Sequence, residues 1–312
     1  MSKIILLGGA SFIGTNLAIK LSENEENEIT VVDKDWAFFK SLRELNLKNI
    51  SYVKSNFENN TEFDKLLQGQ EVVYHLISTT VPTTSNTHIS QEINANVIMT
   101  SNLLEACVRC KVKKVIFISS GGTVYGKEVN CPLTEDTPTY PISSYGLQKI
   151  TIEKLIYLYH YMYNLDYRII RIANPYGPYQ RPNGILGAVT TFTYKALRGE
   201  EITVFGDGSV IRDFIYIDDA VEAILKIADG NKKYKTFNLG CGYGTSIKQL
   251  LDVIASTLNL KLNIYYKEGR KVDVPINYLD ITRYEECYGK LNPISLEEGI
   301  KKTANFMKDK LF

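Results

Sequence analysis

Tyr145 and Lys149 are two residues whose types and spacing suit acid–base chemistry. They begin a helical pattern that runs to about Tyr163, and residues four apart on a helix lie on the same face. A nearby cation favours phenolate over phenol, so we expect Lys149 to lower the pKa of Tyr145 from its ordinary value of about 10 towards working pH. Because the chain contains 21 tyrosines, such a pair also arises by chance, and its meaning depends on the elements around it.

A glycine-rich turn near the N-terminus supplies that context. A short apolar run, Lys3 to Leu7, leads into Gly8-Gly9-Ala10-Ser11-Phe12-Ile13-Gly14, and a helical pattern follows. A second strand pattern, residues 28–32, ends at Asp33. Strand, glycine turn, helix, strand and acid in this order predict a dinucleotide-binding unit, because the glycines let the backbone approach a pyrophosphate at the helix N-terminus.

Asp33 indicates which dinucleotide is bound. A carboxylate at this position accepts hydrogen bonds from ribose hydroxyls and repels a 2′-phosphate, so NAD is favoured over NADP. Ser11 departs from the usual pattern, since it carries a Cβ where a third glycine is expected. The turn must therefore avoid a positive φ at this residue or accept strain. The predicted cofactor-binding residues of this unit are Gly8, Ser11, Phe12, Ile13, Gly14 and Asp33.

Strand and helix patterns alternate through the first half of the chain. Apolar runs typical of buried parallel strands recur at residues 50–54, 71–77, 114–118 and 167–172, with helical patterns between them. This alternation predicts an α/β fold with a doubly wound, Rossmann-like parallel sheet. We expect residues 1–173 to form an NAD-binding domain. Residues 174–312 are expected to form mainly a smaller α+β lobe that binds the substrate, with residues 212–240 returning to the first domain.

Composition and charge argue against several classes of protein. Net charge is +1 without a basic block, so nucleic-acid binding is not expected. No apolar run approaches the roughly 20 residues of a membrane span, and no signal peptide is recognisable before the first strand. The five cysteines are an odd number scattered along the chain, which favours reduced thiols and a cytoplasmic location. The three histidines lack metal-ligand spacing, so no metal site is expected.

In combination, these motifs resemble those of the extended short-chain dehydrogenase/reductase family, in its NAD-dependent epimerase/dehydratase group. The chain is most similar to the UDP-glucose and UDP-N-acetylglucosamine 4-epimerases, and the resemblance spans nearly all of it. It rests on the glycine turn, on the Tyr145 and Lys149 pair, and on three further motifs: Arg171, Asn174, Tyr176, Gly177 and Pro178; the run from Arg212 to Asp219; and Arg270, Asp273, Val274 and Pro275.

The resemblance implies roles that spacing alone does not assign. It places Asn174, Arg212 and Arg270 at the diphosphate of a UDP-sugar substrate, where an amide and two guanidinium groups suit two anionic phosphoryl groups. For Asn96, which the resemblance places near the cofactor, a structural role inside its helix is the alternative. The complete set of residues that the resemblance adds near the cofactor is Asn56, Phe57, Leu76, Asn96 and Ser119.

The chain departs from the family at the catalytic hydroxyl. In the family this residue normally follows a Ser-Ser pair, and here Gly121 occupies the position after Ser119 and Ser120. Either Ser120 or Thr123 must then supply the hydroxyl, or the site relies on Tyr145 alone. We favour Thr123, because it could reach back across the Gly-Gly turn. The segment carries no carboxylate of the kind that dehydratases and decarboxylases of this family use, which favours epimerisation.

We therefore expect an NAD-dependent 4-epimerase of nucleotide sugars. In the mechanism that the resemblance implies, Tyr145 takes the proton of the 4-hydroxyl and hydride moves from C4 to the nicotinamide. The 4-ketosugar then rotates in the pocket and receives the hydride on its other face. Lys149 keeps the phenolate charged and holds the nicotinamide ribose. Asn277 matches a position where relatives restricted to glucose and galactose carry a tyrosine, so some activity on UDP-N-acetylglucosamine is expected.

Two alternative functions fit the same fold. A nucleotide-ketosugar reductase would consume and release NAD(P)H, so the absorbance of reduced nicotinamide would change during turnover. A non-catalytic nucleotide-binding scaffold would typically lack Tyr145 or Lys149, and both are present. The resemblance also implies a homodimer formed by the helices near residues 91–110 and 145–163.

Overall fold

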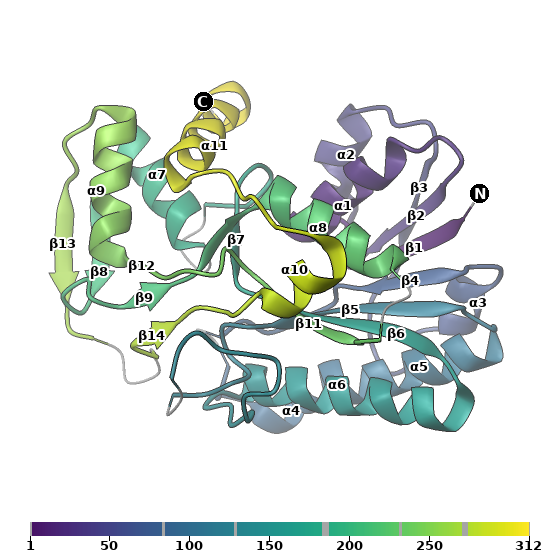
Figure 1. The fold of residues 1–312 in the computed structure, drawn as a ribbon. Coiled ribbons are helices and arrows are strands. Elements are labelled where there is room, and N and C mark those ends of the chain that lie inside the picture. Colours follow the sequence, from purple (N-terminus) through teal and green to yellow (C-terminus); the bar gives the residue numbers. More distant parts are fainter. Residues whose placement is uncertain are drawn as a thin grey trace. The chain divides into compact units, whose positions relative to one another are not determined.

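The computed structural model describes residues 2–82, 85–127, 130–182, 187–230, 233–269 and 274–311. They include a seven-stranded sheet with the strand order β11-β6-β5-β4-β1-β2-β3 (Figure 1). Parallel registers join β4 to β5, β4 to β1, β1 to β2 and β2 to β3. The strands are β1 (Lys3–Leu7), β2 (Glu28–Asp33), β3 (Ile50–Lys54), β4 (Val72–His75), β5 (Lys114–Ser120), β6 (Asp166–Ile172) and β11 (Thr236–Leu239).

The strand order reverses between β1 and β4. From β1 the chain adds β2 and β3 on one side, and it then crosses over to add β4, β5 and β6 on the other. In open parallel sheets, ligands bind outside the carboxyl ends of the strands at this reversal. The predicted doubly wound, Rossmann-like sheet is thus confirmed, and the turns after β1 and β4 mark the expected cofactor site.

Helices cover both faces of this sheet. In Figure 1, α1 (Phe12–Ser22) and α2 (Lys40–Glu44) lie on one face, whereas α3 (Phe63–Leu67), α5 (Met99–Arg109) and α6 (Ser144–Tyr163) lie on the other. Helix α6 packs against α5 and β5. A short 3₁₀ helix (Trp36–Phe39) precedes α2, and α4 (Ile89–Ile93) continues through a π-helical turn (Asn94–Ile98) into α5. The helix predicted near residues 91–110 therefore contains a π turn.

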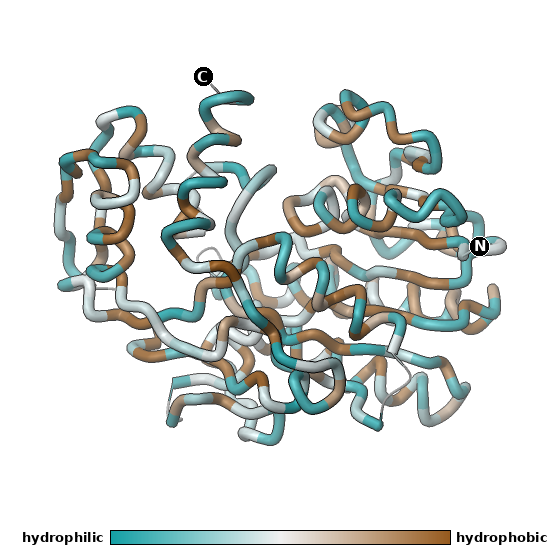
Figure 2. Tube along the Cα trace, turned by 45° about the horizontal axis from the view of Figure 1, so that its top comes forward, coloured by the Kyte–Doolittle hydropathy of each residue, from teal (hydrophilic) through white to brown (hydrophobic). Residues whose placement is uncertain are grey.

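The sheet and the helices α5 and α6 enclose one large hydrophobic cluster. Parallel strands that are covered on both faces bury nearly every side chain, so their sequences are apolar throughout. Figure 2 shows this as brown, hydrophobic stretches along the strands near the N-terminus, with teal, hydrophilic turns at the edge. Members of the cluster from the strands and from both helices include Ile5, Val73, Phe117, Leu103 and Ile152.

The chain divides into two compact units that interleave in sequence. The first unit comprises Met1–Ser120, Ser143–Ile170 and Leu225–Thr236. The second comprises Gly121–Ile142, Arg171–Ile224 and Phe237–Phe312. The segment Gly121–Ile142, which the sequence analysis assigned to the N-terminal domain, thus belongs to the second unit by its contacts.

The second unit combines short strands with helices. Strand β9 (Ile211–Arg212) lies between β12 (Thr245–Ser246) and β14 (Ile276–Asn277), and Ser246 together with Gln249 forms a capping box at the start of α9. Helices α7, α9 and α11 pack on one another. The remaining bounds are β7 (Asn174–Tyr176) paired with β10 (Phe214–Tyr216), β8 (Ile202–Phe205) paired with β13 (Ile264–Lys267), α7 (Ala188–Arg198), α8 (Ile217–Asp229), α9 (Ile247–Leu258), α10 (Thr282–Tyr288) and α11 (Leu296–Leu311).

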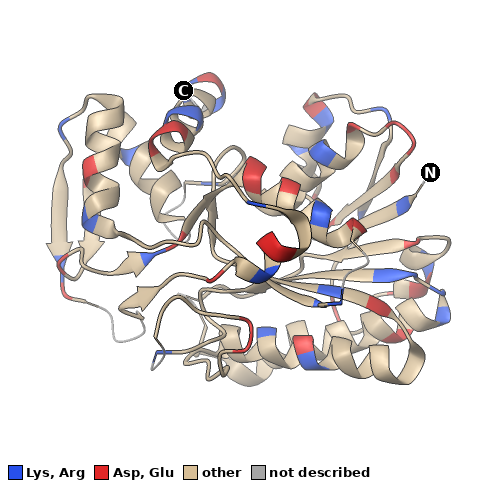
Figure 3. Cartoon of the chain, viewed as in Figure 1, with Lys and Arg blue, Asp and Glu red and all other residues tan. Residues whose placement is uncertain are grey.

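In Figure 3, positions that carry Lys or Arg are interspersed along the chain with positions that carry Asp or Glu. Among the described residues, no helix has the length and apolar character that crossing a membrane requires. Within the same ranges, no group of three or more His, Cys, Asp or Glu side chains could hold a metal ion. All five cysteines are free thiols.

Candidate active site

Gly8 connects the carboxyl end of β1 to the glycine turn. It has φ +78°, and a Cβ at this position would lie 3.2 Å from the carbonyl carbon of Leu76 and from the nitrogen of Ile77, the two residues after β4. Glycine adopts this conformation without steric cost, whereas other residues do not. Gly8 therefore lets the ends of β1 and β4 approach each other at the reversal of the strand order.

Gly14 and Ser11 fix the start of helix α1. A Cβ on Gly14 would lie 2.6 Å from the carbonyl oxygen of Gly9, so a larger residue would push the helix away from the turn. Ser11 is the N-cap residue with φ −76° and ψ 173°, and its Oγ accepts a hydrogen bond from the Gly14 amide at 3.3 Å. Ser11 thus avoids positive φ and caps the helix instead. Phe12 and Ile13, which open the helix, are partly buried.

Asp33 lies at the end of β2, beside this turn. Its side chain is buried, and its two carboxylate oxygens accept hydrogen bonds from the amides of Ala10 at 3.1 Å and Lys34 at 2.8 Å. The turn has no room for side chains at Gly8 and Gly14, and it leads into a helix N-terminus that favours negative charge. A carboxylate beside such a turn fits the predicted NAD, with pyrophosphate at the amides and ribose at Asp33.

Two further predicted cofactor residues lie just after β3. Asn56 is exposed, and its carbonyl oxygen accepts a hydrogen bond from the Thr61 hydroxyl at 2.8 Å. Phe57 is partly buried and packs against the hydrophobic cluster of the first unit. The amide of Ser55 donates to the carbonyl oxygen of Asp33 at 3.0 Å, so this segment starts beside the end of β2.

Asn96 is buried in the π turn between α4 and α5. Its amide nitrogen donates to Thr79 Oγ1 at 2.9 Å and to Gln148 Oε1 at 2.7 Å, and its Oδ1 accepts a hydrogen bond from the Thr79 amide at 2.9 Å. Asn96 thereby joins the segment after β4 to α6. These contacts give the residue a structural role in a π turn, a feature that is frequent at functional sites.

Tyr145 and Lys149 lie on successive turns of α6, as predicted. The helix starts at the N-cap Ser143, whose Oγ accepts a hydrogen bond from the Gly146 amide at 3.1 Å. Lys149 Nζ lies 5.6 Å from the ring centroid of Tyr145. It donates a hydrogen bond to the carbonyl oxygen of Ile118 on β5 at 2.9 Å. The ammonium is thus anchored to the neighbouring strand and remains close to the phenol ring.

Burial dominates the pKa values of this pair. Desolvation raises the pKa of Tyr145 to about 12, and a side-chain hydrogen bond with Ser120 opposes the rise. Desolvation lowers the pKa of Lys149 to about 8, and the charge of Glu153 opposes the fall. The expectation that Lys149 brings the pKa of Tyr145 below its ordinary value is therefore wrong for the protein alone, because the cost of burying a phenolate outweighs the hydrogen bond that favours it.

The two serines at the end of β5 have different partners. Ser119 is buried, and its hydroxyl donates to Glu153 Oε1 at 2.5 Å. Ser120 is the serine whose side chain hydrogen-bonds to Tyr145. The hydroxyl beside the phenol in the first unit is therefore that of Ser120. Thr123, the residue favoured by the sequence analysis, belongs to the second unit.

In the second unit, Arg212 on β9 and Asn277 on β14 are direct cross-strand neighbours. The Arg212 guanidinium donates to the carbonyl oxygen of Val274 at 2.6 Å. Asn277 is only 1% exposed, and its amide nitrogen donates to the carbonyl oxygen of Gly121 at 3.2 Å. Its Oδ1 is buried and has no hydrogen-bond partner in the described part of the chain. Because such an atom is costly to bury, it is a candidate acceptor for a ligand.

Asn174 lies close to the same small sheet. Its side-chain nitrogen donates to the carbonyl oxygen of Asp213 at 2.9 Å, and Asp213 directly follows Arg212. The second unit thus brings together two of the three residues predicted to bind the diphosphate. The third, Arg270, and the motif residue Asp273 lie outside the described residues.

Gly121 has no room for a side chain. A Cβ there would lie 2.5 Å from Leu279 Cδ1 and 3.0 Å from the carbonyl oxygen of Arg171. The packing of Leu279 therefore excludes a serine or threonine side chain at this position. The Oγ1 of Thr123, two residues on, is buried and has no hydrogen-bond partner within the described ranges.

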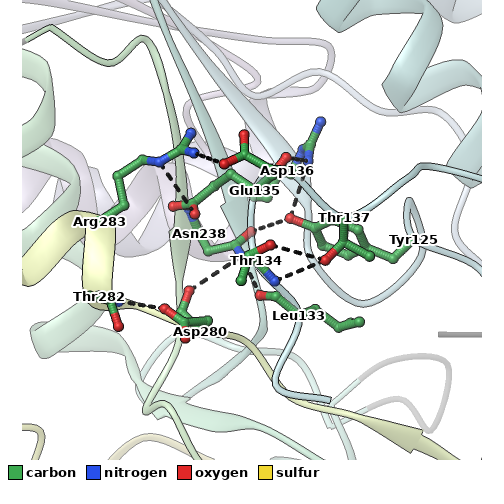
Figure 4. Close-up of polar contacts among 11 residues, drawn as sticks. Tyr125, Leu133, Thr134, Glu135, Asp136, Thr137, Asn238, Asp280, Thr282 and Arg283 are labelled. Atoms are coloured by element: carbon green, nitrogen blue, oxygen red, sulfur yellow. Dashed lines mark hydrogen bonds and ion pairs between the residues drawn. The ribbon is translucent and has the colours of Figure 1, made fainter. Parts of the chain in front are cut away.

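A network of polar contacts holds the segment that carries Gly121 and Thr123 (Figure 4). The Tyr125 hydroxyl donates to Asn238 Oδ1 at 2.5 Å, and Asn238 Nδ2 donates to the carbonyl oxygen of Leu133 at 2.7 Å. Glu135 accepts a hydrogen bond from the Asn238 amide at 2.8 Å and lies 3.5 Å from Arg283. Burial raises the pKa of Glu135. These contacts tie the segment to β11 and α10.

Sequence reasoning missed the polar residues that support the pair on α6. Ser144 donates to the buried Glu92 at 2.5 Å, and Gln148 donates to the same carboxylate at 3.1 Å. Glu153 accepts the Ser119 hydroxyl. Helical spacing could have pointed to Glu153, because it follows Lys149 by four residues and therefore lies on the same face.

Residues 4–240 match the sequence model of the NAD dependent epimerase/dehydratase family. The chain is 35% identical to a putative UDP-glucose 4-epimerase of Methanocaldococcus jannaschii, over 98% of each chain.

Two solved structures have the same fold. One is a UDP-glucose 4-epimerase of Thermotoga maritima with UDP-glucose, which is 34% identical with a TM-score of 0.91 over 99% of this chain and 100% of that one. The other is a UDP-glucuronic acid 4-epimerase of Bacillus cereus with UDP-glucuronic acid and NAD, which is 27% identical with a TM-score of 0.90 over 99% and 100%. The predicted family resemblance and NAD as the family's cofactor are confirmed.

Proposed function

Since this chain belongs to the NAD dependent epimerase/dehydratase family, we propose that it catalyses the 4-epimerisation of a UDP-linked sugar. The observation that carries the proposal is the constellation of Tyr145, Lys149 and Ser120 at the junction of β5 and α6. A phenol, an ammonium and a hydroxyl in this arrangement can exchange one proton with an alcohol group of a substrate.

Tyr145 is the proton acceptor and donor in this proposal. Its phenol oxygen takes the proton of the sugar's 4-hydroxyl as that group becomes a ketone, and it returns the proton when the ketone is reduced. The hydrogen bond with Ser120 and the charge of Lys149 both favour the phenolate. The chemistry that NAD contributes when bound is reversible hydride transfer at C4 of the sugar. The absence of a carboxylate from Gly121-Gly122-Thr123 favours epimerisation over elimination or decarboxylation.

Cofactor retention is assigned to the turn after β1 and to Asp33. The amides at the start of α1 would hold the pyrophosphate, and the Asp33 carboxylate would hold the adenosine ribose. The substrate's diphosphate is assigned to Asn174 and Arg212, whose contacts with backbone carbonyls support their side chains in the second unit. Arg270 completes this set in the proposal.

Asn277 is assigned to sugar recognition. Its unpartnered, buried Oδ1 offers an acceptor for a donor group of the sugar, and an N-acetyl group carries an N–H. We therefore propose UDP-N-acetylglucosamine as a substrate in addition to UDP-glucose. This choice is tested by incubating the purified protein separately with each UDP-sugar and identifying the products by NMR. Turnover of UDP-glucose without any N-acetylgalactosamine product would contradict it.

The same incubation separates an epimerase from a ketosugar reductase of this fold. An epimerase needs no added reduced nicotinamide, and the absorbance of the reduced cofactor shows no net change during turnover. A reductase would oxidise the added NAD(P)H, so the absorbance of the reduced cofactor would fall in proportion to the product formed. We expect product without a net absorbance change.

We also propose that the protein is a cytoplasmic homodimer. Helix α6 exposes a row of large apolar side chains at helical spacing, namely Tyr157, Leu158, Tyr161 and Met162. Such patches mark interaction surfaces, and light scattering should give twice the mass of one chain. Replacing Tyr161, which is 79% exposed, by Glu should yield monomer. The five free thiols suit a reducing compartment.

A further inference from the structure

Glu153 is a buried carboxylate that the proposed mechanism does not use. It lies on α6 one turn beyond Lys149, is 4% exposed, and accepts the hydroxyl of Ser119 at 2.5 Å. Burying a carboxylate is costly unless it is hydrogen-bonded and paired with a positive charge. Its position therefore calls for a cationic neighbour.

Lys149 is that neighbour, and the two side chains hold consecutive residues of the same strand. Lys149, which is 6% exposed, donates to the carbonyl oxygen of Ile118, while Glu153 accepts from the hydroxyl of Ser119. Because residues four apart lie on one face of a helix, both side chains leave α6 in the same direction. The next residue of the strand is Ser120, which hydrogen-bonds to Tyr145.

Other titratable groups face Lys149 and Glu153 from the neighbouring strands. His75 on β4 is fully buried and makes a 2.9 Å hydrogen bond with Thr100, and burial lowers its pKa to about 3, with the charge of Lys149 adding to the effect. Tyr167 on β6 has its pKa raised by burial, with Glu153 among the contributing charges. His75 and Tyr167 are thus neutral near pH 7, as is Tyr145 on α6 itself. Glu153 is the charged neighbour that raises the pKa of Lys149.

We propose that Glu153 is a positioning residue that keeps Lys149 in its ammonium form and, through Ser119, fixes Ser120 beside Tyr145. The inference rests on the proposed function, in which Tyr145 and Lys149 carry the proton exchange. Glu153 touches neither substrate nor reacting atoms in this account and acts only through its neighbours.

The direction of the expected effect follows from the charges. Burial brings the pKa of Lys149 to about 8, and Glu153 opposes this fall. Removing the anion should lower the pKa of Lys149 further. The ammonium exists below that pKa and is lost as pH rises through it, so the alkaline limb of the activity profile should move to lower pH.

The test uses the full chain with NAD bound and lysine labelled with ¹³C at Cε. Glu153→Gln keeps a carbonyl oxygen for Ser119 and removes the charge. We expect it to lower the pKa of Lys149 by about one unit, read from NMR, with the resonance assigned by its loss in Lys149→Met. Glu105→Gln, which removes an exposed carboxylate from α5, is the matched control and should leave that pKa unchanged. A folded Glu153→Gln protein with an unchanged Lys149 titration would overturn the proposal.

A second variant covers the case in which Glu153→Gln does not fold. Glu153→Asp keeps the charge but moves it away by one methylene, so the pKa of Lys149 should fall, by less than in Glu153→Gln. An unchanged Lys149 titration in a folded Glu153→Asp protein would refute the coupling. Both titrations need no sugar, so they remain readable if the proposed epimerase activity fails. If Tyr145→Phe is inactive but the variants of Glu153 leave the pKa of Lys149 unchanged, the proposed function stands and only the role of Glu153 is refuted.

Discussion

Leu279 lies directly over Gly121, so that a methyl group added to the glycine would come within 2.5 Å of Leu279 Cδ1. The same added carbon would lie 3.0 Å from the carbonyl oxygen of Arg171. This contact leaves no room for a serine or threonine side chain at position 121. Because the obstacle is a single side chain, the exclusion of a larger residue from position 121 can be tested by mutation.

Gly121→Ser should destabilise the protein. Overpacking a filled core costs about 1–3 kcal/mol, and we expect a loss of that size in the free energy of unfolding, measured with urea. Leu279→Val removes the obstructing δ carbon, so the double variant should lose less than the sum of the single losses. Strict additivity of the two losses would show that Leu279 is not the obstacle.

Ser120→Ala should impair the reaction more than Thr123→Ala. Ser120 hydrogen-bonds to Tyr145 and opposes the rise in its pKa, and a hydrogen bond to a charged group contributes about 1.5–3 kcal/mol. We expect kcat to fall by about 10-fold or more in Ser120→Ala. In the pH–rate profile, the limb that reports ionisation of Tyr145 should move to higher pH. Thr123→Ala should leave that limb in place. A shift in Thr123→Ala alone would transfer the hydroxyl role to Thr123.

Gly14→Ala should release the cofactor. The added Cβ would lie 2.6 Å from the carbonyl oxygen of Gly9, and because that oxygen belongs to the backbone and cannot rotate away, α1 must move. The amount of NAD released from the denatured, purified protein should fall by about 10-fold or more. Gly269→Ala is the control, because its nearest neighbouring atom lies at 3.7 Å. Equal NAD content in both variants would contradict the assigned cofactor site.

Asp213 should make stability depend on pH. Its carboxylate is buried and accepts hydrogen bonds from the amides of Cys241 at 2.7 Å and Leu279 at 3.3 Å, and burial raises its pKa from 3.8 to about 6. Because the pKa of Asp213 is higher in the folded state than in the unfolded state, its contribution to the free energy of unfolding is fully present below pH 3.8. This contribution is lost as pH rises through about 6.

Asp213→Asn lacks this titration. The stability difference between wild type and variant should therefore shift in favour of the variant by about 2 kcal/mol between pH 4 and pH 7. Urea unfolding at several pH values measures it. A difference that is constant with pH would show that Asp213 does not titrate in this range.

Local patterns predicted the elements that depend on local chemistry. The strands ending at Leu7 and Asp33 and the pair on α6 were all visible in the sequence, because each follows from apolar runs, glycine spacing or helical periodicity. Ser11 shows the limit of such reasoning. The sequence flagged it as a departure, and only the structure showed that its extended backbone lets it cap α1.

Features that depend on distant contacts were not predictable. The hydrogen bond between Ser120 and Tyr145 joins a strand end to a helix 25 residues later in the chain. The raised pKa of Tyr145 reflects how much of the phenol the folded chain buries, which no spacing reveals. The assignment of Gly121–Ile142 to the second unit arises from contacts such as that between Tyr125 and Asn238.

The most direct test of the central claim compares wild type with Tyr145→Phe, both carrying NAD, in the conversion of UDP-glucose to UDP-galactose. General acid–base groups typically contribute about 10²-fold or more. We predict that wild type reaches the epimer equilibrium, whereas Tyr145→Phe retains NAD and turns over at least about 10²-fold more slowly. Equal rates in the two proteins, or a wild type that leaves both UDP-glucose and UDP-N-acetylglucosamine unchanged, would contradict the account.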